Sequence, residues 1–200
     1  MSREAAYPVH PLFIDRWSNR AFTGEPISER DLYTAFEAAR WAPSASNLQP
    51  WRFVFAHADS PRFGEFHGLL ASRNRIWAAR ASALIFVLSH TVITRNDAVQ
   101  PSPSHAFDTG AAWSNFAHQA FLLGYRTRAI GGFDRVRAPE VLGVPDDYVI
   151  LAGVAIGRPD HPDSLDESFR HQETPSARRP LESFVFQDQF PESLLQGDPA

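Results

Sequence analysis

The sequence contains no cysteine, and this absence removes several kinds of chemistry at once. It excludes disulfides, thiolate metal sites, a cysteine nucleophile and cysteine-bound iron–sulfur clusters. Any redox chemistry must therefore come from a group that the protein binds. The eight histidines are scattered along the chain, and we expect no metal site.

Two further absences concern partners. The formal net charge of -4 shows no excess of basic residues, so the chain lacks the electrostatic signature of nucleic-acid binding. No apolar run reaches transmembrane length, and the N-terminus lacks the pattern of a signal peptide. We therefore expect a cytoplasmic protein without a nucleic-acid or membrane partner.

Common catalytic motifs and domain boundaries are also missing. There is no G-x-G-x-x-G, Walker, G-x-S-x-G or H-E-x-x-H motif, no internal repeat and no linker. A length of 200 residues with 44% hydrophobic residues fits one domain. We expect a core over about 10–186 and a loosely ordered tail over 187–200.

Hydrophobic periodicity predicts helices and strands in mixed order. Helices are expected in residues 26–43, with Ser28 as the N-cap, in 61–81 and in 109–123. Strands are expected from Trp51 onward and in 81–90, 147–159 and 178–186, and residues 125–134 are expected to form a short strand followed by a glycine turn. Residues 101–108 and 160–176 are predicted to be loops. The helix over 109–123 is apolar on several sides, which indicates a central position or a subunit interface.

The stretch "RWAPSASNLQPWRFVF", residues 40–55, is unusually dense in small polar side chains. It places Ser44, Ser46, Asn47 and Gln49 directly before Trp51. A plain turn needs only one or two such residues. The density of hydroxyl and amide groups therefore indicates a further role for this loop.

Two basic clusters lie near opposite ends of the chain. Arg16 and Arg20 flank Ser18, and a guanidinium group matches the oxygens of a phosphate. On a helix these two arginines would share a face. Arg178 and Arg179 form the second cluster. The two clusters could converge on one phosphate, or both could be ordinary surface arginines.

Two other features allow both a structural and a binding interpretation. Gly131 and Gly132 could form a hairpin turn, or a backbone that lies against a planar ligand, because glycine permits close approach. Asn74 could be a surface helix residue, or it could read a ligand edge, because its amide both donates and accepts hydrogen bonds.

Taken in order, these segments resemble the nitroreductase family of FMN-dependent oxidoreductases. The likeness runs from about residue 10 to residue 186. Its parts are "HPLFIDRWSNRAF", "ARWAPSASNLQPWRFV", "NRIWAARASALIFV", "FDTGAAWSNFAHQAFLLGY", "GGFD", "AIGRP" and "RRPLESFVF". The ordered set, and the P-S-A-x-N-x-Q-P-W motif within it, make the resemblance specific.

The resemblance implies an α+β fold, with a mainly antiparallel central sheet flanked by helices, in an intertwined homodimer. FMN would lie in the dimer interface. Arg16, Ser18 and Arg178 would hold its phosphate, and Arg20 would place positive charge at the pyrimidine end, where it stabilises the anionic reduced flavin. The other residues implied to bind FMN are Trp17, Pro43, Ser44, Ala45, Ser46, Asn47, Asn74, Ile130, Gly131 and Gly132. Of these, residues 43–47 would line the partner's cofactor pocket, while Gln49 and Trp51 anchor the loop.

The chain departs from the family pattern at two positions. Ser176 and Trp77 stand where some members carry lysines. The first departure weakens the expected phosphate site unless Arg179 contributes. The second removes a charge from the flavin end of the site.

The implied reaction is a two-step, ping-pong hydride transfer. NADH or NADPH reduces the flavin at N5, and a flat conjugated acceptor such as a nitroaromatic or a quinone then takes the electrons. No protein side chain is expected to act as a catalytic residue. The alternatives are another flavin reaction (dehydrogenation, dehalogenation or flavin breakdown), a flavin-binding protein without turnover, and a dimeric scaffold that has lost FMN.

Overall fold

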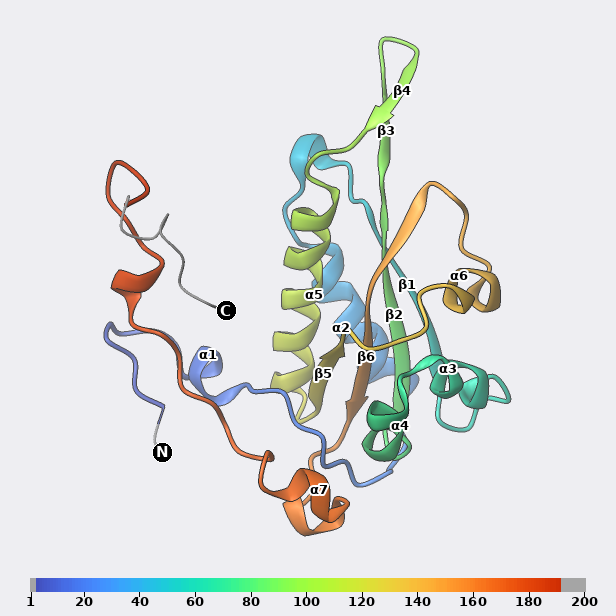
Figure 1. Cartoon of the computed structure of the whole chain (residues 1–200), viewed down its shortest axis with the longest axis vertical. Coiled ribbons are helices and arrows are strands. Elements are labelled where there is room, and N and C mark those ends of the chain that lie inside the picture. The colour runs from blue at the N-terminus through green and yellow to red at the C-terminus, as the bar shows by residue number, and fades with distance from the viewer. Residues whose placement is uncertain (1–2, 192–200) are drawn as a thin grey trace.

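The computed structural model describes residues 3–191, which form an α+β fold around an antiparallel sheet (Figure 1). The four strands lie in the order β1-β2-β6-β5, and each neighbouring pair is antiparallel. Their bounds are β1 Trp51–His57, β2 Ala83–His90, β5 Arg126–Ile130 and β6 Tyr148–Gly157. The predicted fold class is confirmed.

Helices cover both faces of this sheet. One face packs against α2 (Glu29–Arg40) and α5 (His105–Leu122), and the other against α3, α4 and α6. These three shorter helices are Phe63–Leu69, Ser72–Ala78 and Arg137–Leu142. Side chains of β2 alternate between the two cores, so this strand is apolar along its length.

The ends of the two long helices follow from their sequences. The Ser28 hydroxyl accepts a hydrogen bond from the Asp31 N–H (3.0 Å), as expected of the N-cap. Gly124, with φ +84, follows α5 and permits the left-handed turn. The prediction of a loop up to residue 108 is wrong, because α5 begins at His105. Ser104 donates to the buried Asp108 carboxylate (3.0 Å), and this contact stabilises the extra turn.

A hairpin that the sequence analysis did not predict projects from the end of β2 (Figure 1). It consists of β3 (Val92–Arg95) and β4 (Ala98–Pro101), paired antiparallel. Asn96 and Asp97 connect the strands with positive φ angles of 50 and 59. Two left-handed residues form the tight turn that matches the twist of a two-residue hairpin.

The C-terminal third departs from two predictions. The polar segment 160–176 contains α7 (Glu167–Arg170) and buries Leu165 and Phe169, so it is not a surface loop. The predicted strand over 178–186 does not form, because the segment leaves the sheet and has no strand partner within residues 3–191. It holds a single turn of 3-10 helix at Leu181–Ser183.

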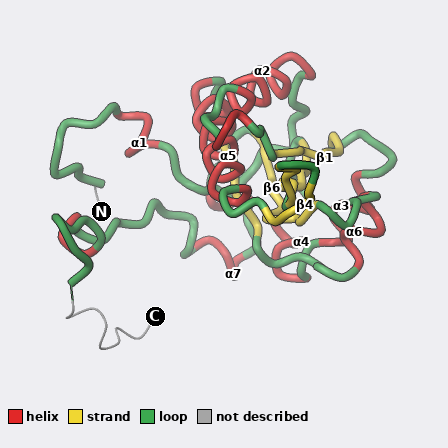
Figure 2. Tube along the Cα trace, turned by 90° about the horizontal axis from the view of Figure 1, so that it is seen from above, coloured by secondary structure: helices red, strands yellow, loops and turns green. Residues whose placement is uncertain are grey.

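Both terminal segments extend away from the sheet on the same side (Figures 1 and 2). The N-terminal arm (residues 3–15) includes the short helix α1 (Pro11–Asp15), and the C-terminal arm (residues 174–191) follows α7. Of the predicted tail, residues 192–200 lie outside the described part of the chain. None of the helices in residues 3–191 has the length and apolar character needed to cross a membrane.

Candidate cofactor site

Residues 16–20, the strap, form neither helix nor strand, so the condition under which Arg16 and Arg20 would share a helical face is not met. Side chains from distant segments bind its backbone in place of helical hydrogen bonds. Arg128 of β5 donates to the Ser18 carbonyl (2.5 Å). The buried Glu173 carboxylate accepts from the backbone N–H groups of Arg20 (2.7 Å) and Ala21 (2.9 Å). These contacts fix the direction of the strap.

Three arginines gather where the strap meets the two terminal arms. Arg3 donates to the carbonyl oxygens of Ile14 and Arg16, the latter at 3.1 Å. Burial, and then the neighbouring guanidinium groups of Arg3 and Arg178, hold the pKa of Arg16 below its usual value. The cluster Arg3/Arg16/Arg178 thus brings three positive charges together, and the Asp15 carboxylate offsets part of the repulsion at Arg3. An anion bound among the three would relieve it.

A second cationic region lies at the other end of the strap. The Arg20 guanidinium donates to the carbonyl (3.4 Å) and the side-chain oxygen (3.3 Å) of Gln172. It also lies 3.8 Å from the Glu173 carboxylate. Burial, and then the charge of Arg20, lower the pKa of the nearby Arg128, while Glu173 opposes the shift. One buried carboxylate is thus shared between two partly desolvated cations.

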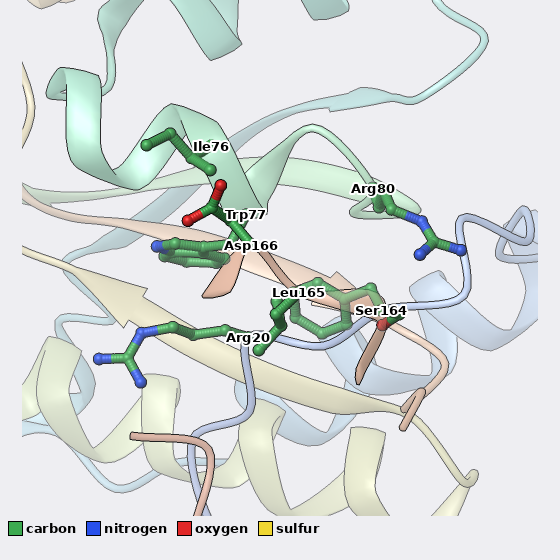
Figure 3. A pocket seen from close by; sticks show the side chains of 8 residues that line it. Arg20, Ile76, Trp77, Arg80, Ser164, Leu165 and Asp166 are labelled. Carbon is green, nitrogen blue, oxygen red and sulfur yellow. The ribbon is translucent and has the colours of Figure 1, made fainter. Parts of the chain in front are cut away.

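Helix α4 and the end of β5 form the adjacent wall. Asn74 donates from Nδ2 to the Gly132 carbonyl (3.1 Å), so two predicted residues are in contact. One turn later on α4, Trp77 is buried and lies beneath Arg128, whose guanidinium carbon is 5.7 Å from the ring centroid. The indole N–H of Trp77 has no hydrogen-bond partner among the described residues. In Figure 3 this nitrogen and the Arg20 guanidinium point to the same side.

The two glycines after β5 do not form the alternative hairpin turn. Neither has a positive φ angle. A Cβ atom at Gly132 would lie 2.9 Å from Nδ2 of Asn74, whereas a Cβ at Gly131 would meet nothing within 4 Å. The described chain therefore gives no reason for glycine at 131, but a planar ligand lying against this backbone would require it.

The polar loop before β1 has an unusual backbone. Ser46, Asn47 and Gln49 all have positive φ angles, between 48 and 55. A left-handed residue other than glycine costs roughly 1–2 kcal/mol. The Ser44 hydroxyl accepts from the Gln49 N–H (3.0 Å), and Trp51 is buried behind the loop. The loop is thus held in a strained shape that presents exposed Ala45, Ser46 and Asn47.

The predicted residues fall into two separate places within one chain. The loop over 43–49 lies at the N-terminal end of α5, where Ala45 contacts Asp108. Strand β5, with its Arg128 contact to the strap, follows the opposite end of α5 (Figure 1). Trp17 is half-buried within the strap, and the Ile130 side chain is buried in the core beside Gly131. A single copy therefore does not bring residues 43–47 to the strap.

Several residues beside the site were not identified from the sequence. Arg126 and Arg128 alternate with Thr127 along β5, and charges at a spacing of two in a strand were a usable signal. No signal in the sequence pointed to Arg3, Asp108 or Glu173, because each of them contacts a segment that is distant in the sequence. Within residues 3–191 there is no cluster of metal-ligating side chains.

Comparison with known proteins places this arrangement in context. The sequence model of the nitroreductase family matches residues 14–63. A crystal structure described as an oxidoreductase containing FMN has a TM-score of 0.92 and 46% identity, covering 94% of this chain and 96% of that chain. An NADH dehydrogenase from Thermus thermophilus is 29% identical over 212 residues, covering 91% of this chain and 98% of its own length. An NADPH-flavin oxidoreductase from Vibrio harveyi is 28% identical over 151 residues, covering 72% and 62%.

Proposed function

Because the chain belongs to the nitroreductase family, we propose that it is an FMN-dependent oxidoreductase that draws electrons from NADH or NADPH. The observation that carries the proposal is the cluster Arg3/Arg16/Arg178, in which three cations crowd together beside the strap. A phosphate group would supply an anion with several acceptor oxygens for these guanidinium groups. Hydrogen bonds between a guanidinium group and a phosphate are roughly twice as strong as those between neutral groups.

The remaining wall suits the flavin ring. The open space over Gly131 leaves room for a flat molecule against the backbone. Asn74 lies beside it, and Arg20 offers a cation at the far end of the strap. These residues would bind and orient the ring, and they include no nucleophile or acid–base pair. When bound, FMN supplies hydride transfer between the nicotinamide and an acceptor. We propose a flat conjugated acceptor, such as a nitroaromatic or a quinone.

We further propose that the working unit is a cytoplasmic homodimer with FMN between the subunits. The loop over 43–49 needs a second copy to reach a strap, since its own strap lies at the other end of α5. The arms also expose large apolar side chains, such as Phe13 (56%) and Phe184 (58%), on a cleft of about 440 Å³. Sedimentation should therefore give a dimer, and a stable monomer that binds FMN fully would contradict the shared site.

The phosphate assignment is tested by comparing FMN with riboflavin, which lacks the phosphate. Titration of the apoprotein, followed by flavin fluorescence, should show FMN binding at least about 100-fold more tightly, because two charged hydrogen bonds contribute about 1.5–3 kcal/mol each. The double variant Arg16→Ala/Arg178→Ala should stay folded and lose this preference. The exposed pair Arg95→Ala/Arg137→Ala is the matched control. Equal affinity for both flavins in the unaltered protein would refute the assignment.

A further inference from the structure

Arg128 stands at the junction of the three elements that surround the proposed ring site. It lies on β5, shortly before Gly131, and its Nη1 donates to the Ser18 carbonyl of the strap (2.5 Å). Its guanidinium carbon is 5.7 Å from the Trp77 ring of α4. One of its five N–H groups is occupied by Ser18, so the side chain retains donors for a further acceptor.

The positive charge around Arg128 is only partly balanced by nearby carboxylates. Arg20 and Arg73 lie in the same region, where each places its guanidinium over the Phe169 ring, at 5.7 and 5.2 Å. Two carboxylates lie in this region: Glu173, whose Oε1 is already bound by two backbone N–H groups, and Asp166, which lines a pocket together with Arg20 and Trp77 (Figure 3). Trp77 adds no charge and an indole N–H that has no partner in the described part of the chain. This corner therefore holds three guanidinium groups against two carboxylates, and the remaining positive charge favours an acceptor that gains negative charge.

We infer that Arg128 is a second cation, beside Arg20, at the pyrimidine end of bound FMN, and that it raises the reduction potential of the flavin. This inference rests on the proposed function. The sequence contains no lysine, so arginine supplies all such charge in this protein.

The electron balance explains the direction of the effect. The nicotinamide gives up a hydride, which is two electrons and one proton, and is oxidised. Bound FMN would accept the hydride at N5, and the negative charge of the reduced ring would lie at its pyrimidine end. A fixed, partly desolvated guanidinium at that end lowers the energy of the charged form relative to the oxidised form.

The test separates charge from packing at position 128. Arg128→Gln keeps a donor for the Ser18 carbonyl but removes the charge, and Arg128→Lys keeps the charge. The midpoint potential of bound FMN is measured by anaerobic titration against a reference dye. Arg128→Gln should bind reduced FMN about tenfold less tightly relative to oxidised FMN, which is a negative shift of about 30 mV for a two-electron couple. The midpoint potential of FMN bound to Arg128→Lys should stay near that of the unaltered protein.

Arg126 provides the matched control on the same strand. It is also half-buried, but its guanidinium lies over Phe121 of α5, at 4.2 Å from the ring centroid. Arg126→Gln should therefore leave the potential unchanged. If Arg128 had a purely structural role, replacing it would lower thermal stability. The midpoint potential of bound FMN would then not be more negative in Arg128→Gln than in Arg128→Lys.

The outcomes distinguish this inference from the proposed function. If the unaltered protein binds no FMN, the proposed function fails and the inference fails with it. If FMN binds and is reduced, but Arg128→Gln has the unaltered potential, only the inference is overturned. If Arg128→Gln does not fold, the unaltered protein provides the test. A midpoint potential of bound FMN at or below that of free FMN would contradict stabilisation of the reduced flavin by these cations.

Discussion

The carboxylate of Asp108 accepts a hydrogen bond from the backbone N–H of Ala45 at 3.1 Å, although the two residues are 63 positions apart. Asp108 is buried in the first turn of α5, and it also accepts from the Ser104 hydroxyl. It therefore ties the strained polar loop to the longest helix of the fold. We consider Asp108 a positioning residue, which acts through the loop rather than on a ligand.

Replacing Asp108 with alanine should destabilise the protein and loosen the loop. Two donors would lose their acceptor, at an expected cost of about 1–3 kcal/mol in the free energy of unfolding. Urea unfolding followed by circular dichroism measures this change. Asp108→Asn keeps an acceptor oxygen and should be destabilised less. The exposed Asp146→Ala should have a free energy of unfolding within about 0.5 kcal/mol of the unaltered protein. Full stability in Asp108→Ala would show that the contact does not hold the loop.

Leucine at position 131 should separate ligand binding from folding. The side chain of Gly131→Leu would enter open space, so the free energy of unfolding should change by no more than about 0.5 kcal/mol. The same side chain would occupy the space proposed for the flavin, and FMN affinity should fall at least about tenfold, which is about 1.4 kcal/mol. Fluorescence titration of the apoprotein with FMN measures the second effect.

Two other glycines serve as references for that experiment. Gly64→Leu also places a side chain in open space, but on α3, and should leave FMN affinity unchanged. Gly132→Ala should displace the Asn74 amide, which lies 2.9 Å from the new Cβ position. If Gly131→Leu binds FMN as tightly as the unaltered protein, no ligand lies against this backbone.

His118 should give the protein a measurable dependence of stability on pH. Burial, and then the charge of Arg16, hold its pKa below the usual value near 6.5. The unfolded chain therefore binds a proton more readily than the folded chain. The stabilising contribution is present above pH 6.5 and is lost as the pH falls through the lowered pKa of the folded state.

Thermal unfolding at pH 7.5 and pH 5.5 tests this sign, with both values chosen to flank the ordinary histidine pKa of about 6.5. The midpoint should fall on acidification, and it should fall less in His118→Gln. His171→Gln, which changes an exposed histidine, is the control and should behave as the unaltered protein does. If the unfolding midpoint of His118→Gln fell as much as that of the unaltered protein, His118 would not be the cause of the pH dependence.

Much of the fold followed from local signals in the sequence. The apolar run of β2 and the Ser28 cap of α2 were sufficient to place both elements. The segment over 160–176 was misjudged because its composition is polar, while the burial of Leu165 and Phe169 depends on packing with the rest of the fold. The turn at Asn96 and Asp97 was a local signal for the missed hairpin.

The candidate site was less readable from sequence. The chemistry of Arg16, Asn74 and Gly131 marked them as candidates with both a structural and a binding interpretation, and the resemblance to the family supplied their binding roles, which stay predictions. Arg128 and Glu173 reach the strap from β5 and from the segment after α7, and periodicity contains no information on such long-range contacts. The role of Trp77, which departs from the family pattern, could likewise be interpreted only from the structure, where the Arg128 guanidinium lies over its ring.

The most direct test of the central claim is the visible absorption spectrum of the FMN-incubated protein, recorded without oxygen before and after addition of NADH or NADPH. We predict a flavin band that copurifies with the protein on gel filtration, bleaches on addition of the nicotinamide, and returns when a quinone is added. A protein that stays colourless after incubation with FMN, or whose flavin band neither nucleotide bleaches, would contradict the proposed oxidoreductase.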